Sequence, residues 1–229
     1  MRKAVILFNL GGPDSLDAVE PFLFNLFNDP AIISLPTILR YPLAKLISKR
    51  RAPIAKGIYS EMDGKSPILE QTESQANAIE KSLEDQGDEY KCFIVMRCWY
   101  PRAKEVLEKV KNFMPDQIIL LPLYPQYSNA TSGSSIKEWL DLCKKDKFTV
   151  DTKIVCCYPN EKDFVLSYAT LIKNKLDQSK LKDTILIFSA HGLPEIKIKK
   201  GDPYQWQVEN TVQELVKNLS IPNLNYILS

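Results

Sequence analysis

The stretch KAVILFNLGGPDS, residues 3–15, joins an unbroken apolar run to an abrupt turn. A β-strand that is covered on both faces has a continuous apolar sequence, whereas a strand with one face in water alternates apolar and polar residues. Gly11, Gly12 and Pro13 then end the run, because glycine and proline favour turns. The stretch therefore predicts a buried first strand and a tight turn. Its apolar part is too short for a signal peptide, and no cleavage-type sequence follows it.

The same kind of strand recurs along the chain and alternates with helical patterns. Residues 66–86 show the helical pattern best, because Ser66 can cap a helix, Pro67 suits its first position, and apolar residues follow at helical spacing. This alternation predicts an α/β fold with mostly parallel sheets and helices on both faces. A boundary near residues 146–150 divides the chain into two similar lobes, 1–147 and 148–229. The expected strands are 3–10, 90–98, 117–125, 149–158, 183–190 and one that starts near 224, and the expected helices are 15–29, 66–86, 101–113, 132–145, 161–178 and 203–219.

The stretch 30–57, PAIISLPTILRYPLAKLISKRRAPIAKG, interrupts this alternation. It is rich in proline, leucine, isoleucine and basic residues. One interpretation is an apolar lip with a cationic edge, which suits a flat apolar substrate or a membrane surface. The other interpretation is a helix that packs on the core and exposes its basic face to water. The sequence leaves both open.

Composition excludes several classes of protein. The chain has 229 residues, 45% of them hydrophobic, and a formal net charge of +2, so it is globular and needs no nucleic-acid partner. Its five cysteines include no C-x-x-C pair, which favours neither a zinc site nor a disulfide framework. Reduced thiols in a cytoplasmic protein are the simplest interpretation. No stretch approaches the ~20 apolar residues that would span a membrane.

Polar side chains follow several of the expected strands, in the segments NLGGPDS, MRCWYP, LPLYPQYSNATSGSS and FSAHGLP. Ligands of open α/β sheets bind beyond the carboxyl ends of the strands, so these segments should line one cleft. Arginine, aromatic rings and hydroxyls around one histidine suggest a large, flat, partly anionic ligand. No nucleotide-binding motif occurs. The residues concerned are Asn9, Arg97, Trp99, Tyr124, Tyr127, Ser128, Ser134, Ser135 and His191.

His191 is the only histidine of the chain. A lone histidine can be structural, but this one follows a buried strand and precedes Gly192 and Pro194, so it should project into the cleft. An imidazole with a reference pKa of ~6.5 can take up a proton or hold a divalent metal near neutral pH. His191 is therefore the candidate catalytic residue.

Four segments, taken in order, resemble the ferrochelatases, the enzymes that insert Fe²⁺ into a porphyrin to form haem: FNLGGPDSLDAVEPFLFNLFNDP, GKSPILEQTESQANAIEKSL, LPLYPQYSNATSGSS and FSAHGLPEIKIKKGDPYQWQVENT. The resemblance implies two Rossmann-like lobes with the porphyrin cleft between them. It gives His191 the role of metal ligand or acceptor of a pyrrole proton. Protoporphyrin IX and coproporphyrin both remain open as the substrate.

The resemblance also implies the other site residues and partners. Stretch 30–57 corresponds to the lip that admits porphyrin near a membrane, so the chain is expected in the cytoplasm or peripherally on the inner membrane. Fe²⁺ is a substrate, and no resident cofactor is expected. Asn129 stands where some members supply a cysteine to an iron–sulfur cluster, so no cluster is expected either. The porphyrin-binding candidates are Tyr59, Ser66, Arg97, Tyr124, Tyr127, Ser128 and Ser134.

The main departure from the family lies at the end of the chain. Ferrochelatases continue beyond the strand that begins at NYILS, and they carry there a glutamate that faces the histidine. Glu195 and Glu209 do not match its motif, so the second lobe is expected to be incomplete, with exposed apolar strands. The alternatives are an inactive porphyrin-binding remnant, half of a split enzyme completed by a C-terminal polypeptide, or a related chelatase for another tetrapyrrole.

Overall fold

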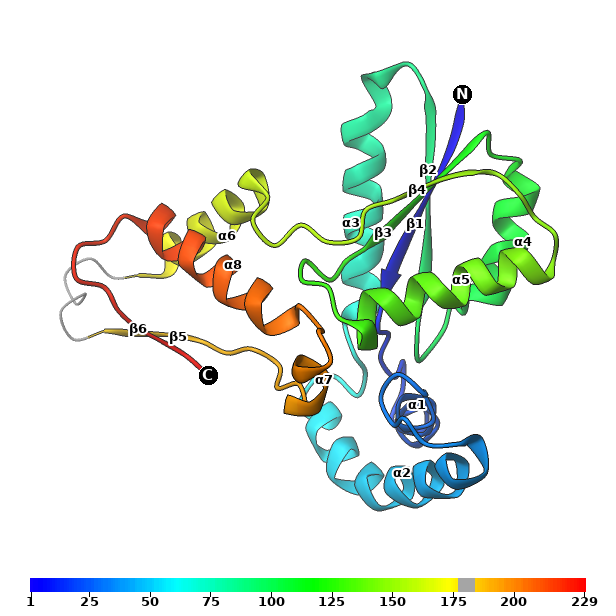
Figure 1. Ribbon diagram of the computed structural model, residues 1–229, viewed down its shortest axis with the longest axis horizontal. Helices are drawn as coiled ribbons and strands as arrows, with labels where there is room; N and C mark the ends of the chain where they lie inside the picture. The colour runs from blue at the N-terminus through cyan, green and yellow to red at the C-terminus, as the bar shows by residue number, and fades with distance from the viewer. Residues whose placement is uncertain (177–183) are drawn as a thin grey trace. The chain divides into compact units, whose positions relative to one another are not determined.

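The computed structural model describes residues 1–176 and 184–229 (Figure 1). The chain forms two compact units. The first contains Met1–Tyr124 and Asn129–Cys156, and the second contains Pro125–Ser128 and Cys157–Ser229. The lobe boundary expected at residues 147 and 148 stays a prediction. The α/β fold class is confirmed, because both units hold parallel strands connected through helices.

The first unit is built on a four-stranded parallel sheet with the order β2-β1-β3-β4. β1 (Arg2–Asn9) lies between β2 (Glu89–Met96) and β3 (Gln117–Pro122), and β4 (Asp151–Ile154) forms the edge beside β3. Residues 4–8 of β1 are buried, as the opening apolar run predicts for a strand covered on both faces. β4 pairs with β3 from Gln117 to Leu120.

Helices cover both faces of this sheet. Phe8 points toward α4 and α5, where its ring meets Trp139 edge-on at 6.2 Å between centroids. Val5 and Leu7 point to the opposite face and pack with Ala76 of α3. The alternation of side chains along a strand produces these two cores. The helices of the first unit are α1 (Val19–Phe27), α2 (Thr37–Ser60), α3 (Ile68–Leu83), α4 (Ala103–Phe113) and α5 (Ser134–Lys145), with short turns at Glu84–Gln86 and Asn129–Gly133.

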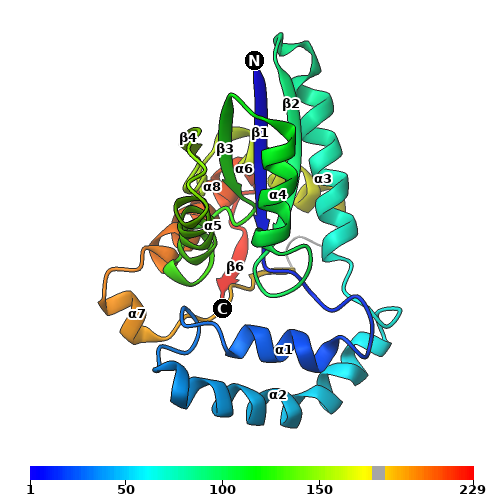
Figure 2. The same cartoon turned by 90° about the vertical axis from the view of Figure 1, so that its right-hand side faces the viewer.

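The stretch 30–57 contains most of α2, which lies along α1 beyond the carboxyl end of β1 (Figure 2). Ala44, Ser48 and Ala52 are buried on one side of α2. Ile38 and Ile54, on other positions of the helix, are mostly exposed. Both interpretations of this stretch therefore describe part of it, because the helix packs on α1 and also presents apolar side chains to the outside.

The second unit contains a helical pair and a small sheet. α6 (Lys162–Lys175) packs against α8 (Tyr204–Leu219) around Val165, Ala169 and Leu215. β5 (Ile185–Phe188) pairs in parallel with β6 (Asn225–Leu228). A short helix, α7 (Glu195–Lys199), precedes α8. The expected ends of the 161–178 helix and the 183–190 strand fall partly on residues 177–183, outside the described residues.

β5 and β6 differ from the buried strands of the first unit. Ile185, Ile187, Tyr226 and Ile227 are all exposed in the described structure. The apolar pattern alone predicts burial on both faces for these strands, and that prediction is wrong here, because helices α6 and α8 cover only one side. The exposure agrees with the other expectation, that of apolar strands left exposed in the second lobe. Across residues 1–176 and 184–229, no helix is both long and apolar enough to cross a membrane.

Candidate active site

Three strands of the first unit end beside one another and continue into polar segments. The amide of Arg97, directly after β2, donates to the Asn9 carbonyl at the end of β1 over 2.8 Å. The amide of Cys98 donates in the same way to the Leu10 carbonyl. The Asn9 side-chain amide donates to the Thr72 hydroxyl on α3 over 3.1 Å. The carboxyl edge of the sheet is thus fixed to α3, as expected for the binding edge of an α/β sheet.

The Gly-Gly-Pro turn after β1 fits tightly against Ser66. The Ser66 amide donates to the Pro13 carbonyl over 2.8 Å, and its hydroxyl accepts from the Ile68 amide at 3.4 Å. A methyl group on Gly12 would lie 2.5 Å from the Ser66 Cβ, closer than van der Waals contact allows. Glycine at this position therefore lets the turn seat Ser66 at the sheet edge. Tyr59, near the end of α2, is half-buried, and burial raises the pKa of its hydroxyl.

Arg97 is held by two carboxylates. Its Nε donates to Asp29 Oδ2 at 2.8 Å and its Nη2 to Asp29 Oδ1 at 3.1 Å, while Nη1 lies 2.7 Å from Glu138 Oε2. Burial alone would lower the pKa of Arg97, but the hydrogen bond to Asp29 and the charge of Glu138 outweigh it, so the pKa is raised. Arg102 Nη2 lies 3.8 Å from Glu138 Oε1, so its positive charge partly compensates the negative charge of the Glu138 carboxylate. The guanidinium is therefore cationic and well neutralised.

Tyr124 lies in the interior of the same unit. Its hydroxyl oxygen and that of Ser135 are both buried, and neither has a partner with hydrogen-bond geometry. Burial raises the pKa of the Tyr124 hydroxyl well above its usual range. The neighbouring Ser134 hydroxyl donates to the carbonyls of Ala130 and Thr131 at 3.1 and 3.0 Å. Tyr124 is thus a neutral phenol, and the Ser134 hydroxyl is committed to its own helical turn.

Cys98, in the same interior, should be chemically inert in the native chain. Burial, with the charge of Asp29, raises the pKa of its thiol to about 12. At pH 8 the thiolate fraction is then roughly one in 10⁴, and only the thiolate reacts with alkylating agents. After brief iodoacetamide treatment, peptide mass mapping should find exposed Cys156 modified and Cys98 intact. Equal labelling of the two in the native chain would contradict this placement.

The segment Pro125–Ser128 belongs to the second unit and is hydrogen-bonded to the start of α8. Ser128 Oγ donates to Asp202 Oδ2 at 2.9 Å, and both residues are buried. The Tyr127 amide donates to Gln207 Oε1 at 2.7 Å. Gln126 Nε2 donates to the Thr211 hydroxyl at 3.0 Å. These bonds join the LPLYPQYS and GDPY motifs, so both motifs have a structural role here.

Asp202→Ala should destabilise the second unit by about 2 kcal/mol, because it leaves a buried Ser128 hydroxyl and the Tyr204 amide without their acceptor. Urea unfolding of the full chain measures the loss. Glu214→Ala on α8 is the matched control, since the Glu214 side chain forms a surface pair with Lys217 and its carbonyl bond to Asn218 survives the change. The cost should stay within about 0.5 kcal/mol. Equal unfolding midpoints for the two variants would contradict the role given to Asp202.

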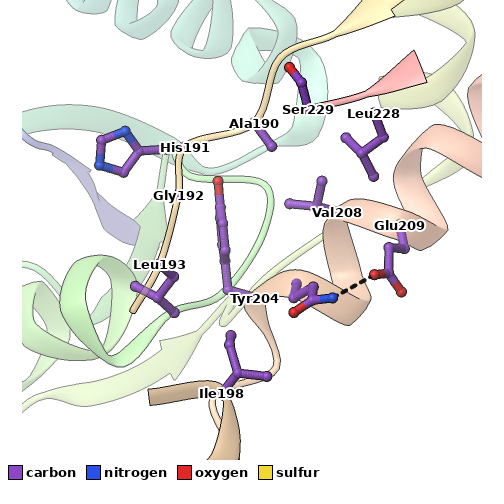
Figure 3. Close-up of a pocket in the computed structure, with 11 residues that line it drawn as sticks. Ala190, His191, Gly192, Leu193, Ile198, Tyr204, Val208, Glu209, Leu228 and Ser229 are labelled. Atoms are coloured by element: carbon purple, nitrogen blue, oxygen red, sulfur yellow. Dashed lines mark hydrogen bonds between the residues drawn. The ribbon is translucent and has the colours of Figure 1, made fainter. Parts of the chain in front are cut away.

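His191 lies on an exposed segment between β5 and α7 and lines a pocket of about 330 Å³ (Figure 3). Tyr204 and Leu228 line the same pocket. The imidazole points away from Glu209, whose carboxylate accepts from Gln205 Nε2 at 2.9 Å. Within the described residues, the imidazole has no hydrogen bond or ion pair. It is therefore available to an incoming group, as its position after a strand predicts.

The structure thus places the predicted site residues in two groups. His191, Tyr127 and Ser128 belong to the second unit, and the other candidates belong to the first. Sequence reasoning missed the partners Asp29, Glu138 and Asp202. Asp29 and Asp202 each had a signal, because they lie in the quoted segments that end in NDP and contain GDPY, whereas Glu138 had none. Within the described ranges, no group of three or more His, Cys, Asp or Glu side chains could hold a metal ion.

Comparison with known proteins agrees with the family resemblance that the polar segments and the histidine indicated. The family model for ferrochelatase matches residues 2–229. The chain belongs to the ferrochelatase family. A ferrochelatase of Pelagibacter ubique is 63% identical over 231 residues, which cover 100% of this chain and 67% of the relative. One from a Wolbachia of Drosophila simulans is 52% identical, covering 99% of this chain and 72% of the relative.

A ferrochelatase of Rickettsia bellii is 48% identical over 226 residues, which cover 98% of this chain and 62% of that protein. The chain therefore spans about two thirds of the length of these ferrochelatases. The matched region of the Pelagibacter protein covers both units. The resemblance first inferred from four short segments is confirmed over the whole chain.

Proposed function

We propose that this chain performs the reaction of its family, the insertion of Fe²⁺ into a porphyrin as a lyase of haem biosynthesis. The observation that carries the proposal is the exposed, unpartnered imidazole of His191 in the segment that follows β5. Fe²⁺ enters the reaction as a substrate, and the protein needs no resident cofactor. The free porphyrin loses two pyrrole protons as the dication enters, so a base must accept them.

His191 is suited to this step because a neutral imidazole nitrogen can take a proton or bind a divalent metal. Both roles need the unprotonated ring, and an exposed ring can return a proton to water. We assign His191 to one of these two roles. General-base assistance of this kind contributes typically ~10²–10⁴-fold to a rate.

The porphyrin-binding surface is assigned to the candidates from the sequence, some as direct contacts and others as supports behind them. Tyr59 is half-buried at the end of α2, and Ser66 lies at the Gly-Gly-Pro turn. The Tyr124 hydroxyl is buried and has no hydrogen-bond partner within residues 1–176 and 184–229, so Tyr124 is assigned to the wall behind the substrate. The hydroxyls of Ser128 and Ser134 already donate within the protein, so these residues support the wall of the site. The Tyr127 side chain completes the set, and Arg97 is assigned to it through the residues that it positions, because Asp29 and Glu138 occupy its guanidinium.

Helix α2 supports a peripheral contact with a membrane. Its exposed apolar side chains Ile38, Leu46 and Ile54 accompany the exposed cations Lys49 and Arg50. Apolar and basic side chains together favour binding at the surface of an anionic bilayer. A cytoplasmic protein that touches the inner membrane through this helix would receive its apolar substrate from that surface.

The exposed apolar faces of β5 and β6 support the second candidate function. An uncovered apolar sheet face favours contact with another polypeptide segment. On this alternative, the chain binds porphyrin and becomes active only when a C-terminal polypeptide of the kind found in its longer relatives completes the small sheet. This alternative makes the chain half of a split enzyme.

The test is a metal-insertion assay on the purified 229-residue chain, with Zn²⁺ as a surrogate for Fe²⁺ and with protoporphyrin IX and coproporphyrin assayed separately by absorbance. Turnover supports the enzyme. Porphyrin binding without turnover, restored by the C-terminal segment of the Pelagibacter relative, supports the split enzyme. A chain that neither binds nor metallates either porphyrin would overturn the proposal.

A further inference from the structure

Three side chains that lie far apart in the sequence meet at the carboxyl edge of the first sheet. Asp29 follows α1, Arg97 follows β2, and Glu138 lies on α5. Their side chains are 5%, 14% and 25% exposed, so the ion pairs are shielded from water. Asp29 and Arg97 form a bidentate ion pair through both carboxylate oxygens. This geometry fixes the orientation of the guanidinium as well as its distance from the carboxylate. We name these three residues the lip anchor.

The lip anchor holds the loop that leads into α2. Asp29 Oδ1 also accepts from the Ala31 amide at 2.8 Å, and the Asp29 carbonyl accepts from the amides of Ile32 and Ile33. Asp29 therefore orders the first residues of the 30–57 stretch through its carboxylate and its carbonyl, and its carboxylate ties them to Arg97. The Asn25 side-chain amide donates to the Cys98 carbonyl at 3.0 Å and adds a second tie between α1 and the sheet edge.

Arg40 continues this arrangement into the helix. It is buried, and its guanidinium donates to the carbonyls of Asn28 and Leu35 at 2.9 and 2.6 Å and to the Thr37 hydroxyl at 3.2 Å. The loop between α1 and α2 is thus bonded at one end to the partly buried Arg97 and at the other to the buried Arg40. A loop with so many buried hydrogen bonds opens rarely, because opening breaks the ion pairs and leaves charged groups without their partners, which costs free energy.

From this arrangement we propose that Asp29 is a positioning residue, which fixes the 30–57 lip to the sheet edge through Arg97 before porphyrin binds. Arg97 then acts on the substrate through the lip, since both oxygens of Asp29 and one of Glu138 occupy its guanidinium. The porphyrin part of this inference rests on the proposed function, whereas the anchoring of the lip does not.

The test compares Asp29→Asn with Asp141→Asn in the full chain. Asp141 is exposed on α5, where it pairs only with Lys137, so it controls for loss of one carboxylate from the same unit. The first readout is trypsin cleavage, because α2 carries basic residues at 40, 45, 49, 50, 51 and 56. The second is the dissociation constant for protoporphyrin IX, measured without metal by quenching of tryptophan fluorescence.

Asp29→Asn should speed cleavage within residues 40–56 about tenfold or more and weaken porphyrin binding by about three- to tenfold, because it leaves Arg97 only partly compensated. Asp141→Asn should change neither by more than about twofold. Arg97→Lys, which keeps the charge but cannot pair through two parallel bonds, should resemble Asp29→Asn, and it serves as the test if Asp29→Asn does not fold.

Unchanged cleavage of both variants would overturn the anchoring. Faster cleavage with unchanged porphyrin affinity would overturn the link between the lip and the substrate. A wild-type chain that binds no porphyrin would instead mark a failure of the proposed function, and the cleavage arm would still decide the role of Asp29.

Discussion

Gly12→Ala is expected to destabilise the chain by about 2–4 kcal/mol, as overpacking of a tight contact does. The added Cβ would lie 2.4 Å from the Ser66 hydroxyl oxygen, 2.5 Å from the Ser66 Cβ and 3.3 Å from a methyl group of Ile68. Ser66 cannot move away easily, because its amide donates to Pro13 in the same turn. The turn and the start of α3 must therefore separate.

The measurement is urea unfolding of the full chain, followed by tryptophan fluorescence. Trp99 and Trp139 both lie in the first unit, where the clash occurs. Adding Ser66→Gly to the variant removes both close atoms and should recover at least half of the lost stability. Gly57→Ala is the matched control, since no described atom beyond its chain neighbours and the backbone of its own helix lies within 4 Å of the added Cβ.

Gly57 occupies the interior of α2, so alanine there should raise stability by up to about 1 kcal/mol. Replacing glycine by alanine should therefore lower the free energy of unfolding at Gly12 and raise it at Gly57. A Gly12→Ala chain as stable as the wild type would contradict the close packing of the turn against Ser66.

Most of the fold could be predicted because burial leaves a direct mark on the sequence. The run at residues 4–8 is apolar at every position, and the structure buries it at the centre of the sheet. The same reasoning failed for β5 and β6, whose apolar residues include Ile187 and Ile227. An apolar run indicates that a strand is suited to burial. Whether the strand is buried depends on the helices or strands that pack against it in the tertiary structure.

The stretch 30–57 exposes another limit of the pattern. Its Pro42 and Pro53 argue against a long helix, yet α2 runs from Thr37 to Ser60 with both inside it. Proline normally removes a bond from a helix interior. Packing along α1 and the bonds of Arg40 stabilise the helix against this cost. Tertiary contacts therefore override the local preference.

The sequence predicted which residue types form the candidate site better than it predicted the contacts that these residues make. Arg97 was recognised as a cleft residue, but Asp29, its partner, lies 68 positions earlier in the chain. Sequence periodicity carries no information about such a pair. Ser128 and Ser134 were predicted to contact porphyrin, and the structure gives their hydroxyls to partners within the protein. Their porphyrin contacts stay a prediction.

His191 follows β5 and is exposed, as expected for a residue that leaves the core after a strand, and its projection into a cleft stays a prediction. Its exposure and its lack of a partner among the described residues agree with a group that meets a substrate. Its chemical role is the central claim. His191→Ala should slow metal insertion by about 100-fold or more, because the chain contains no second histidine to replace it.

The direct measurement determines two quantities on the same samples, the rate of Zn²⁺ insertion and the dissociation constant for porphyrin without metal. If the 229-residue chain turns over only with the C-terminal segment of its relative, both variants are measured with that segment. Lys217→Ala is the control, because Lys217 is exposed on α8 and belongs to no proposed site. We expect that His191→Ala loses insertion while it binds porphyrin within about threefold of the wild type, and that Lys217→Ala changes neither quantity. Insertion by His191→Ala at the wild-type rate would contradict this expectation.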